Sequence, residues 1–243
     1  MKLKEWSAPV LLAAISLLST SAAVATPVVG QVDDFEDGTT QGWFINAVGM
    51  GVPPAEAIPT NIATGGPGGL DDNYLRLTSL GGNGSGSRLA VNNADPRWTG
   101  DYLAAGVNAI IMDVINLGST DLALRLALED PTVGPPSNVA FTTDAVILPV
   151  GGGWTPVTFL IGPGDLTAGL GDINTALMGA TFLRLYHSPD PGFPNPAFPI
   201  PTVVSQLGVD NITAAVVPEP STLTLAGFGT LGLLGYVRLR KRA

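Results

Sequence analysis

Residue types that could carry out catalysis are scarce in this sequence. His187 is the sole histidine and there is no cysteine, so neither a thiol nucleophile nor a histidine-rich zinc site can form. No G-x-S-x-G segment marks a serine nucleophile. Paired carboxylates could hydrolyse glycosides, but nothing singles out one pair. Strand alternation puts His187 on the side of Leu183 and Leu185, which predicts a partly buried structural residue. We therefore expect no enzyme.

A few polar and aromatic side chains could instead bind a sugar. Alternation places Arg125 opposite the leucines of its strand, and it places Arg184 and Tyr186 opposite the leucines of theirs. Asp113 lies on the corresponding face of its own strand. If these strands are neighbours, the side chains form a polar platform for sugar hydroxyls. The alternative is a solvated outer face with ordinary charge pairs.

Three tryptophans, Trp43, Trp98 and Trp154, each adjoin turn residues. An aromatic ring at such a place could stack on a sugar, or it could cover the edge of the core. The sequence favours the covering role.

The elements that must position these residues are β-strands. Apolar residues alternate over 110–115, 122–128 and 157–161, and the segments 141–148 and 181–187 are similar. Gly- and Pro-rich segments separate them at 65–69, 81–86, 131–136, 151–153 and 189–201. Only 172–178 favours a short helix, with Asp172 as its N-cap. About ten short strands with long loops predict an all-β, two-sheet sandwich over residues 26–217.

The charge of this region excludes several functions. Residues 26–217 contain five arginines, no lysine and 18 Asp or Glu, a net charge of −13. Such a surface repels nucleic acid and anionic lipid, so we expect no nucleic-acid partner.

The N-terminus has the pattern of a secretory signal peptide over residues 1–25. Lys2 and Lys4 precede an apolar stretch, and Ala23 and Ala25 supply small residues at the −3 and −1 positions of the cleavage site. Export through the Sec translocon is the expectation.

The C-terminus combines a polar motif at 218–222, an apolar span at 223–237 and a basic tail at 238–243. The span of 15 residues is about 22 Å of helix, short for a bilayer core of about 30 Å. The basic tail should stay cytoplasmic, which leaves the sandwich on the outer side of the membrane. A G-x-G-x-x-G spacing at 227–232 lacks the surrounding βαβ unit, so we reject a nucleotide site.

Pro218, Glu219 and Pro220, together with the Gly/Leu-rich span and the Arg-rich end, resemble the PEP-CTERM sorting signal. The resemblance covers about a tenth of the chain. It implies recognition by an exosortase, a processing enzyme in the inner membrane of Gram-negative bacteria. The tail would then be a transient anchor, and the protein would pass to the cell surface or beyond.

Both ends of the sandwich region resemble those of jelly-roll carbohydrate-binding modules and laminin-IV-like domains. The resemblance lies in residues 32–38 with 41–43, and in residues 208–212. It implies that the first and last strands pair, and that a structural calcium bridges them. Glu36 and Asp210, with a carbonyl near Gly38, would supply the oxygen ligands, and Asp34 and Asp37 are alternates. The other possibility is that these acids are solvated turn charges.

A second acidic loop, residues 71–73, could also bind an ion, but a turn before the strand at 74–77 is favoured.

Two functions of different classes follow. The first is an exported, non-catalytic structural or interaction protein of the cell surface or exopolysaccharide matrix. The second is a carbohydrate-binding module that recognises an extracellular polysaccharide through Arg125, Arg184 and Tyr186.

Overall fold

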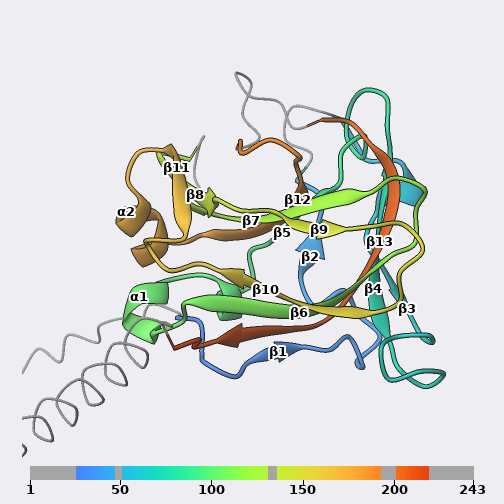
Figure 1. Ribbon diagram of the computed structural model, residues 1–243, viewed down its shortest axis with the longest axis horizontal. Coiled ribbons are helices and arrows are strands. Elements are labelled where there is room, and N and C mark those ends of the chain that lie inside the picture. Colours follow the sequence, from blue (N-terminus) through green and yellow to red (C-terminus); the bar gives the residue numbers. More distant parts are fainter. Residues whose placement is uncertain (1–25, 47–50, 131–135, 193–200, 219–243) are drawn as a thin grey trace, which may run out of the picture.

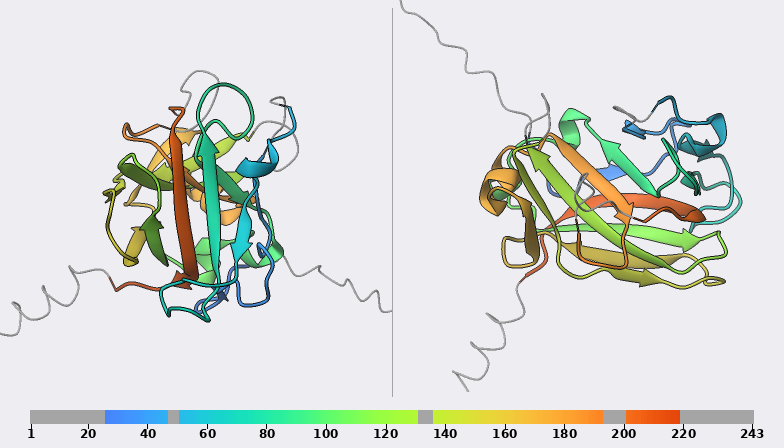
Figure 2. Two further views of the ribbon diagram at one scale, coloured as in Figure 1. Left: turned by 90° about the vertical axis from the view of Figure 1, so that its right-hand side faces the viewer. Right: turned by 90° about the horizontal axis from the view of Figure 1, so that it is seen from above.

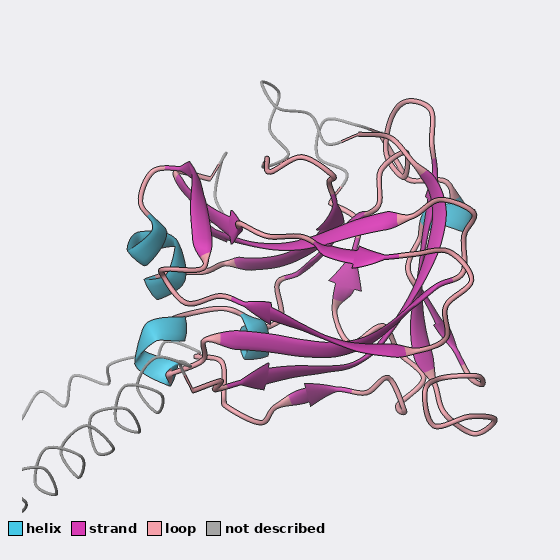
Figure 3. Cartoon of the chain, viewed as in Figure 1, coloured by secondary structure: helices cyan, strands magenta, loops and turns pink. Residues whose placement is uncertain are grey.

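The computed structural model describes residues 26–46, 51–130, 136–192 and 201–218. These residues form two antiparallel β-sheets packed against each other, with short helices at the ends of the strands (Figures 1 and 3). The prediction of an all-β, two-sheet sandwich is confirmed.

Sheet A contains, in spatial order, β10 (Thr155–Leu160), β6 (Ala109–Asn116), β13 (Val204–Ala215), β4 (Tyr74–Leu80) and β3 (Thr60–Ile62), with β1 (Val32–Asp33) beside β13. Sheet B contains β11 (Leu166–Leu170), β8 (Asn138–Thr142), β7 (Leu122–Asp130), β12 (Phe182–His187), β5 (Ala90–Asn93) and β2 (Trp43–Phe44), with β9 (Val146–Leu148) beside β7. The helices are η1 (Ala55–Ala57), η2 (Pro96–Trp98), α1 (Tyr102–Ala105) and α2 (Ile173–Met178).

The core lies between the sheets and takes its side chains from alternate strand positions. In β7 these are Leu122, Leu124, Leu126 and Leu128, and each is buried. The other face of β7 was expected to be solvated, but this expectation is wrong. Ala127 belongs to a second, smaller apolar cluster on the outer side of sheet B, and Arg125 is buried there too.

Residues 141–148 do not form the single strand that alternation predicts. Both β8 and β9 lie along the same edge of β7, but the four residues of β7 from Leu124 to Ala127 lie opposite six residues, from Phe141 to Val146. The two extra residues interrupt the hydrogen-bond ladder, as a β-bulge does. The interruption lies beside Arg125, whose guanidinium bonds to the freed carbonyls of Thr142 and Thr143.

The first and last strands pair, as the jelly-roll resemblance implies. Val32 and Asp33 of β1 lie opposite Thr213 and Ile212 of β13. Between Asp210 and Thr213, β13 carries one more residue than β6 does, and the chain bulges there. Figure 2 shows β13 and β4 side by side within sheet A.

The predicted helix at 172–178 is confirmed as α2. Asp172 caps it, since its carboxylate accepts a hydrogen bond from the Thr175 amide at 2.9 Å. The helix α1 was not predicted; it is a single turn capped by Asp101 and closed by Gly106 in the left-handed region (φ 70°).

Both targeting segments lie outside the described residues, including Ala23, Ala25, Glu219 and Pro220. Pro218 is the last described residue and is exposed. Within the described part of the chain, no helix has the length and apolarity to span a bilayer.

Residues 26–217 are expected to fold without either flanking segment. The strands of the described residues all lie between Val32 and Ala215, and Val217 is bonded through both its N–H and its C=O to the amide side chain of Asn108. A chain of residues 26–217 should therefore show a β-type circular dichroism spectrum and one cooperative thermal transition. A non-cooperative transition would place the domain boundary elsewhere.

Candidate functional site

The structure brings Arg125, Arg184 and Tyr186 of the predicted sugar platform together on sheet B but closes this face, and Asp113 lies on β6 of sheet A instead of beside them. Arg125 and Tyr186 lie directly opposite each other on β7 and β12, and Arg184 is two residues further along β12. Arg125 is 4% exposed and Tyr186 is fully buried. The expectation that this face is open to solvent is therefore wrong, whether as a sugar platform or as a charged surface.

Arg125 is held entirely by backbone carbonyls. Its guanidinium donates to Thr142 O, Thr143 O and Ser188 O at 2.7–3.0 Å, and to Pro189 O at 3.4 Å. The Tyr186 hydroxyl donates to Gly192 O at 3.0 Å. Arg125 thus ties the β7 face both to the β8–β9 interruption and to the segment after β12.

Arg184 belongs to a buried polar network that the sequence did not predict. Its guanidinium lies 2.7 Å from Glu129 Oε1 and donates to Asn92 Oδ1 at 2.7 Å. Burial raises the pKa of Glu129, and the Arg184 charge opposes this shift. The network was missed because the predicted strand stopped at residue 128, although Glu129 continues the alternation of Arg125 and Ala127.

A second group of polar residues lies on the outer face of sheet A, where β13 bulges. Asp210 faces Asp113 across β13 and β6 and is only 1% exposed. Its carboxylate accepts the Asn211 amide at 2.7 Å, while the Asn211 side chain donates to Asp113 at 3.0 Å. Burial is the main cause that raises the pKa of Asp210 to about 7; the nearby charges of Asp72, Asp113 and Glu36 act in the same direction, and the Asn211 hydrogen bond opposes them.

The other predicted calcium ligands are placed less closely. Glu36 lies near enough to affect Asp210, and its Oε1 accepts the Asn73 amide at 2.8 Å. Gly38 closes a turn through its amide and Phe35 O (3.1 Å), and no described contact joins it to Asp210. The alternates Asp34 and Asp37 accept local bonds from Gln41 and Thr39. Across the described ranges, no three acidic or histidine side chains form a group that could hold a metal ion by themselves.

Asp33 is the most constrained acid, and the sequence did not single it out. Its Oδ2 accepts from the indole N–H groups of Trp43 at 3.0 Å and Trp98 at 2.8 Å. Its Oδ1 lies 3.1 Å from the Arg97 guanidinium. Burial raises the pKa of Asp33, and Arg97 opposes the rise. Trp43 and Trp98 therefore belong to the core rather than to a sugar platform.

The remaining candidates have different environments. His187 is buried, and its Nδ1 accepts the Ala123 amide at 2.9 Å, so the ring is held as the structural residue that alternation predicted. Burial lowers its pKa. Trp154 differs from the other two tryptophans because it is only partly buried and lies on the outside of sheet A.

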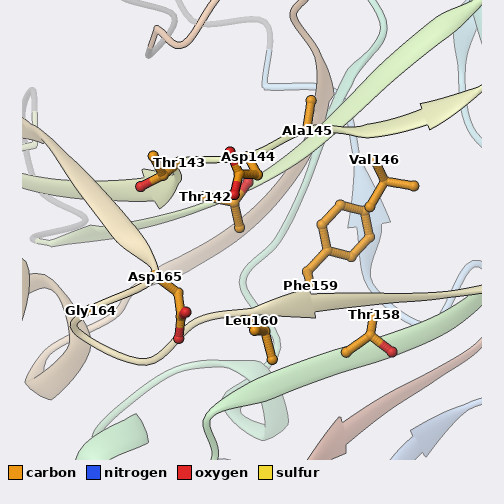
Figure 4. A pocket seen from close by; sticks show the side chains of 10 residues that line it. All are labelled: Thr142, Thr143, Asp144, Ala145, Val146, Thr158, Phe159, Leu160, Gly164 and Asp165. Atoms are coloured by element: carbon orange, nitrogen blue, oxygen red, sulfur yellow. The ribbon is translucent and has the colours of Figure 1, made fainter. Parts of the chain in front are cut away.

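A small cavity of about 280 Å³ opens between the β8–β9 interruption and β10 (Figure 4). Thr142, Phe159 and the exposed Asp144 and Asp165 are among its lining residues. Its volume is just below the range of roughly 300–1,000 Å³ typical of small-molecule pockets. The Thr142 hydroxyl already accepts the Leu126 amide, so the polar groups left for a ligand are chiefly the two carboxylates.

The fold is that of the jelly-roll carbohydrate-binding modules. The chain superposes on the family 11 carbohydrate-binding module of a cellulosomal cellulase of Clostridium thermocellum with a TM-score of 0.50 and 11% identity, over 81% of this chain and 99% of that one. It also matches part of an exo-β-agarase, with a TM-score of 0.50 and 14% identity. That match covers 78% of this chain and only a quarter (25%) of the agarase chain. These identities establish the fold alone.

The particular feature of this chain is its tail. Residues 216–242 match the family described as the PEP-CTERM protein-sorting motif, which confirms the resemblance seen in the sequence. The chain therefore carries the signal of exported proteins that are processed at the C-terminus by an exosortase. No curated protein matches the chain.

Arg125 should be critical for stability. The variant Arg125→Gln leaves several backbone carbonyls without a hydrogen-bond donor. The free energy of unfolding should therefore fall by roughly 3 kcal/mol. The matched control is Arg76→Gln, because Arg76 is partly exposed on sheet A and makes no described side-chain bond. Urea denaturation that finds equal losses in the two variants would contradict the role given to Arg125.

Asp210 should make stability depend on pH in the presence of a chelator. Its native pKa of about 7 exceeds the ordinary value near 3.9, so between these limits the native state holds a proton that the unfolded state has lost. Stability should therefore rise as the pH falls from 8 to 5. In Asp210→Asn, the gain in the free energy of unfolding between pH 8 and pH 5 should be smaller, by on the order of 2 kcal/mol. Identical pH profiles from thermal melts of the two proteins would refute this.

Proposed function

We propose that this chain is an exported cell-surface or exopolysaccharide-matrix protein, processed by an exosortase, whose sandwich has a non-catalytic structural or interaction role. The observation that carries the proposal is the position of the sorting motif. β13 closes the sandwich at Ala215, and the match to the motif begins at residue 216. The sorting signal thus directly follows the folded domain, which is the part of the chain that it would deliver.

The environments of the polar residues support a non-catalytic role. His187, Arg125 and the Arg184–Glu129 pair are buried and bonded to the protein itself, so they are not presented to a substrate. The jelly-roll fold supports the same proposal, since it is shared with non-catalytic binding modules.

Carbohydrate binding is the second candidate function, and the shared fold favours it. The predicted contacts Arg125, Arg184 and Tyr186 would have to be uncovered first, because Tyr186 is fully buried and Arg125 nearly so. A polysaccharide-binding role therefore needs another surface of the domain.

The sorting proposal is tested with the full chain in an exosortase-bearing Gram-negative bacterium. The wild-type protein should lose its tail and reach the surface or extracellular fraction. Replacing Pro218, Glu219 and Pro220 by alanine should leave a full-length protein in the inner-membrane fraction, whereas Pro163→Ala, in an exposed loop of the domain, should behave as wild type. Normal release of the triple variant, measured by fractionation and intact mass, would contradict the proposal.

We also propose that calcium binds beside Asp210, with Glu36 as the second carboxylate. The supporting observation is that the Asp210 carboxylate is buried among negative charges and is paired with no cation in the described ranges. Glu36 and Asp210 alone do not complete a calcium shell, so carbonyl groups would supply the remaining oxygens.

Calcium should raise the melting temperature of residues 26–217 relative to chelator at pH 8. The increase should be smaller at pH 5, where Asp210 holds a proton, and smaller in Asp210→Asn. Asp144→Asn, in the exposed loop between β8 and β9 of sheet B, is the control and should keep the response. Equal melting temperatures with calcium and with chelator would rule out the site.

A further inference from the structure

The outer face of sheet A carries an aromatic pair that no predicted site includes. Trp154, from the loop before β10, packs edge-to-face with Tyr74 of β4, with ring centroids 5.3 Å apart and an interplanar angle of 76°. The indole N–H donates to Gly65 O at 2.9 Å, which fixes the ring. Both side chains are only partly buried, unlike Trp43 and Trp98.

Gly208, in the middle of β13, allows these rings to lie against the sheet. A β-carbon there would meet Ile115 Cγ2 at 2.6 Å, Trp154 Cη2 at 2.9 Å and Tyr74 Cε2 at 3.2 Å. A glycine within a central strand commonly marks such a close approach. The two rings therefore pack against the backbone of a central strand, and both remain partly exposed.

Arg76 adds a hydrogen-bond donor beside the aromatic pair. It lies directly opposite Gly208 on β4 and on the same face as Tyr74, two residues away. Across the described ranges its guanidinium makes no ion pair and no side-chain hydrogen bond, although it is partly buried. Arg76 differs in this respect from Arg97, Arg125 and Arg184, which are each bonded to other groups of the protein.

Acceptor groups lie on the neighbouring strands β6 and β13, on the same outer face. Asp113 shares a face of β6 with Ile115, which contacts the Gly208 position, and Asp113 is partly exposed. Gln206, two residues before Gly208 on β13, adds an amide on the same face. The aromatic pair is thus flanked by a guanidinium, an amide and a carboxylate.

We propose that Trp154, Tyr74 and Arg76 form a binding site for a neutral, hydroxyl-rich polysaccharide on the outer face of sheet A. The proposal rests on the proposed interaction role of the domain and names the ligand class and the surface. Aromatic faces stack on the C–H faces of sugar rings, and the flanking donors and acceptors match sugar hydroxyls. An anionic glycan is disfavoured, because the carboxylates of Asp72 and Asp113, both near Asp210, add negative charge to this region of sheet A.

Affinity gel electrophoresis of residues 26–217 in hydroxyethylcellulose, glucomannan and agarose tests the site, with alginate as the anionic comparison. Retardation is expected in at least one neutral gel and not in alginate. Trp154→Ala should weaken that binding by about tenfold or more, and Arg76→Gln by about fivefold. Phe44→Ala, which removes a partly exposed aromatic from sheet B, should leave binding unchanged.

Because Trp154→Ala uncovers Gly208 and could unfold the domain, Trp154→Phe and Tyr74→Leu are measured alongside it, each with a thermal melt. Folded variants with reduced retardation support the site. Unchanged retardation of folded Trp154 and Tyr74 variants overturns it and assigns Trp154 a covering role only. Three other results would also overturn the site. They are loss of binding in Phe44→Ala instead, stronger retardation by alginate than by the neutral gels, and no retardation in any neutral gel. The export and processing test is independent of these results, so its failure can be told apart from theirs.

Discussion

The carboxylate of Asp33 lies inside the core and accepts hydrogen bonds from two indole N–H groups, those of Trp43 and Trp98. Asp33 belongs to β1 of sheet A, whereas Trp43 belongs to β2 of sheet B, so this one carboxylate joins the two layers. Arg97 reaches it from the partly exposed side and compensates its charge at 3.1 Å. A buried acid is tolerated only when its hydrogen bonds and charge are satisfied in this way, and these contacts hold β1 against both sheets.

Once the sandwich is closed in this way, its two outer faces have different properties. On sheet B, Arg125, Tyr186 and the Arg184–Glu129 pair are buried and bonded to carbonyls or to each other, so polar groups there serve stability. On sheet A, Gly208 lets Trp154 and Tyr74 lie on the strand surface while staying partly exposed. The face that alternation made attractive for ligands is therefore closed, and the interaction surface that we infer lies on the other sheet.

Strand periodicity was sufficient to predict the sandwich, because a buried face imposes a period of two on β6, β7 and β12. It also placed Arg125, Arg184 and Tyr186 on one face, but periodicity does not show what covers a face. The role of Asp33 could not be read from the run Asp33-Asp34, since only tertiary packing distinguishes the buried acid from its exposed neighbour. The same holds for Gly208 and Trp154, which are 54 positions apart and meet only when β10, β6 and β13 assemble.

The most direct measurement is a ¹H–¹⁵N NMR titration of the tryptophan indole groups in residues 26–217, which contain only Trp43, Trp98 and Trp154. The titrant is a soluble oligosaccharide of the neutral polysaccharide that retards the protein. We predict that the oligosaccharide shifts the indole signal of Trp154. The indole signals of Trp43 and Trp98, whose N–H groups are bonded to Asp33, should not shift. Binding that leaves the Trp154 signal in place, or that moves the two buried indoles instead, would contradict a binding surface on sheet A.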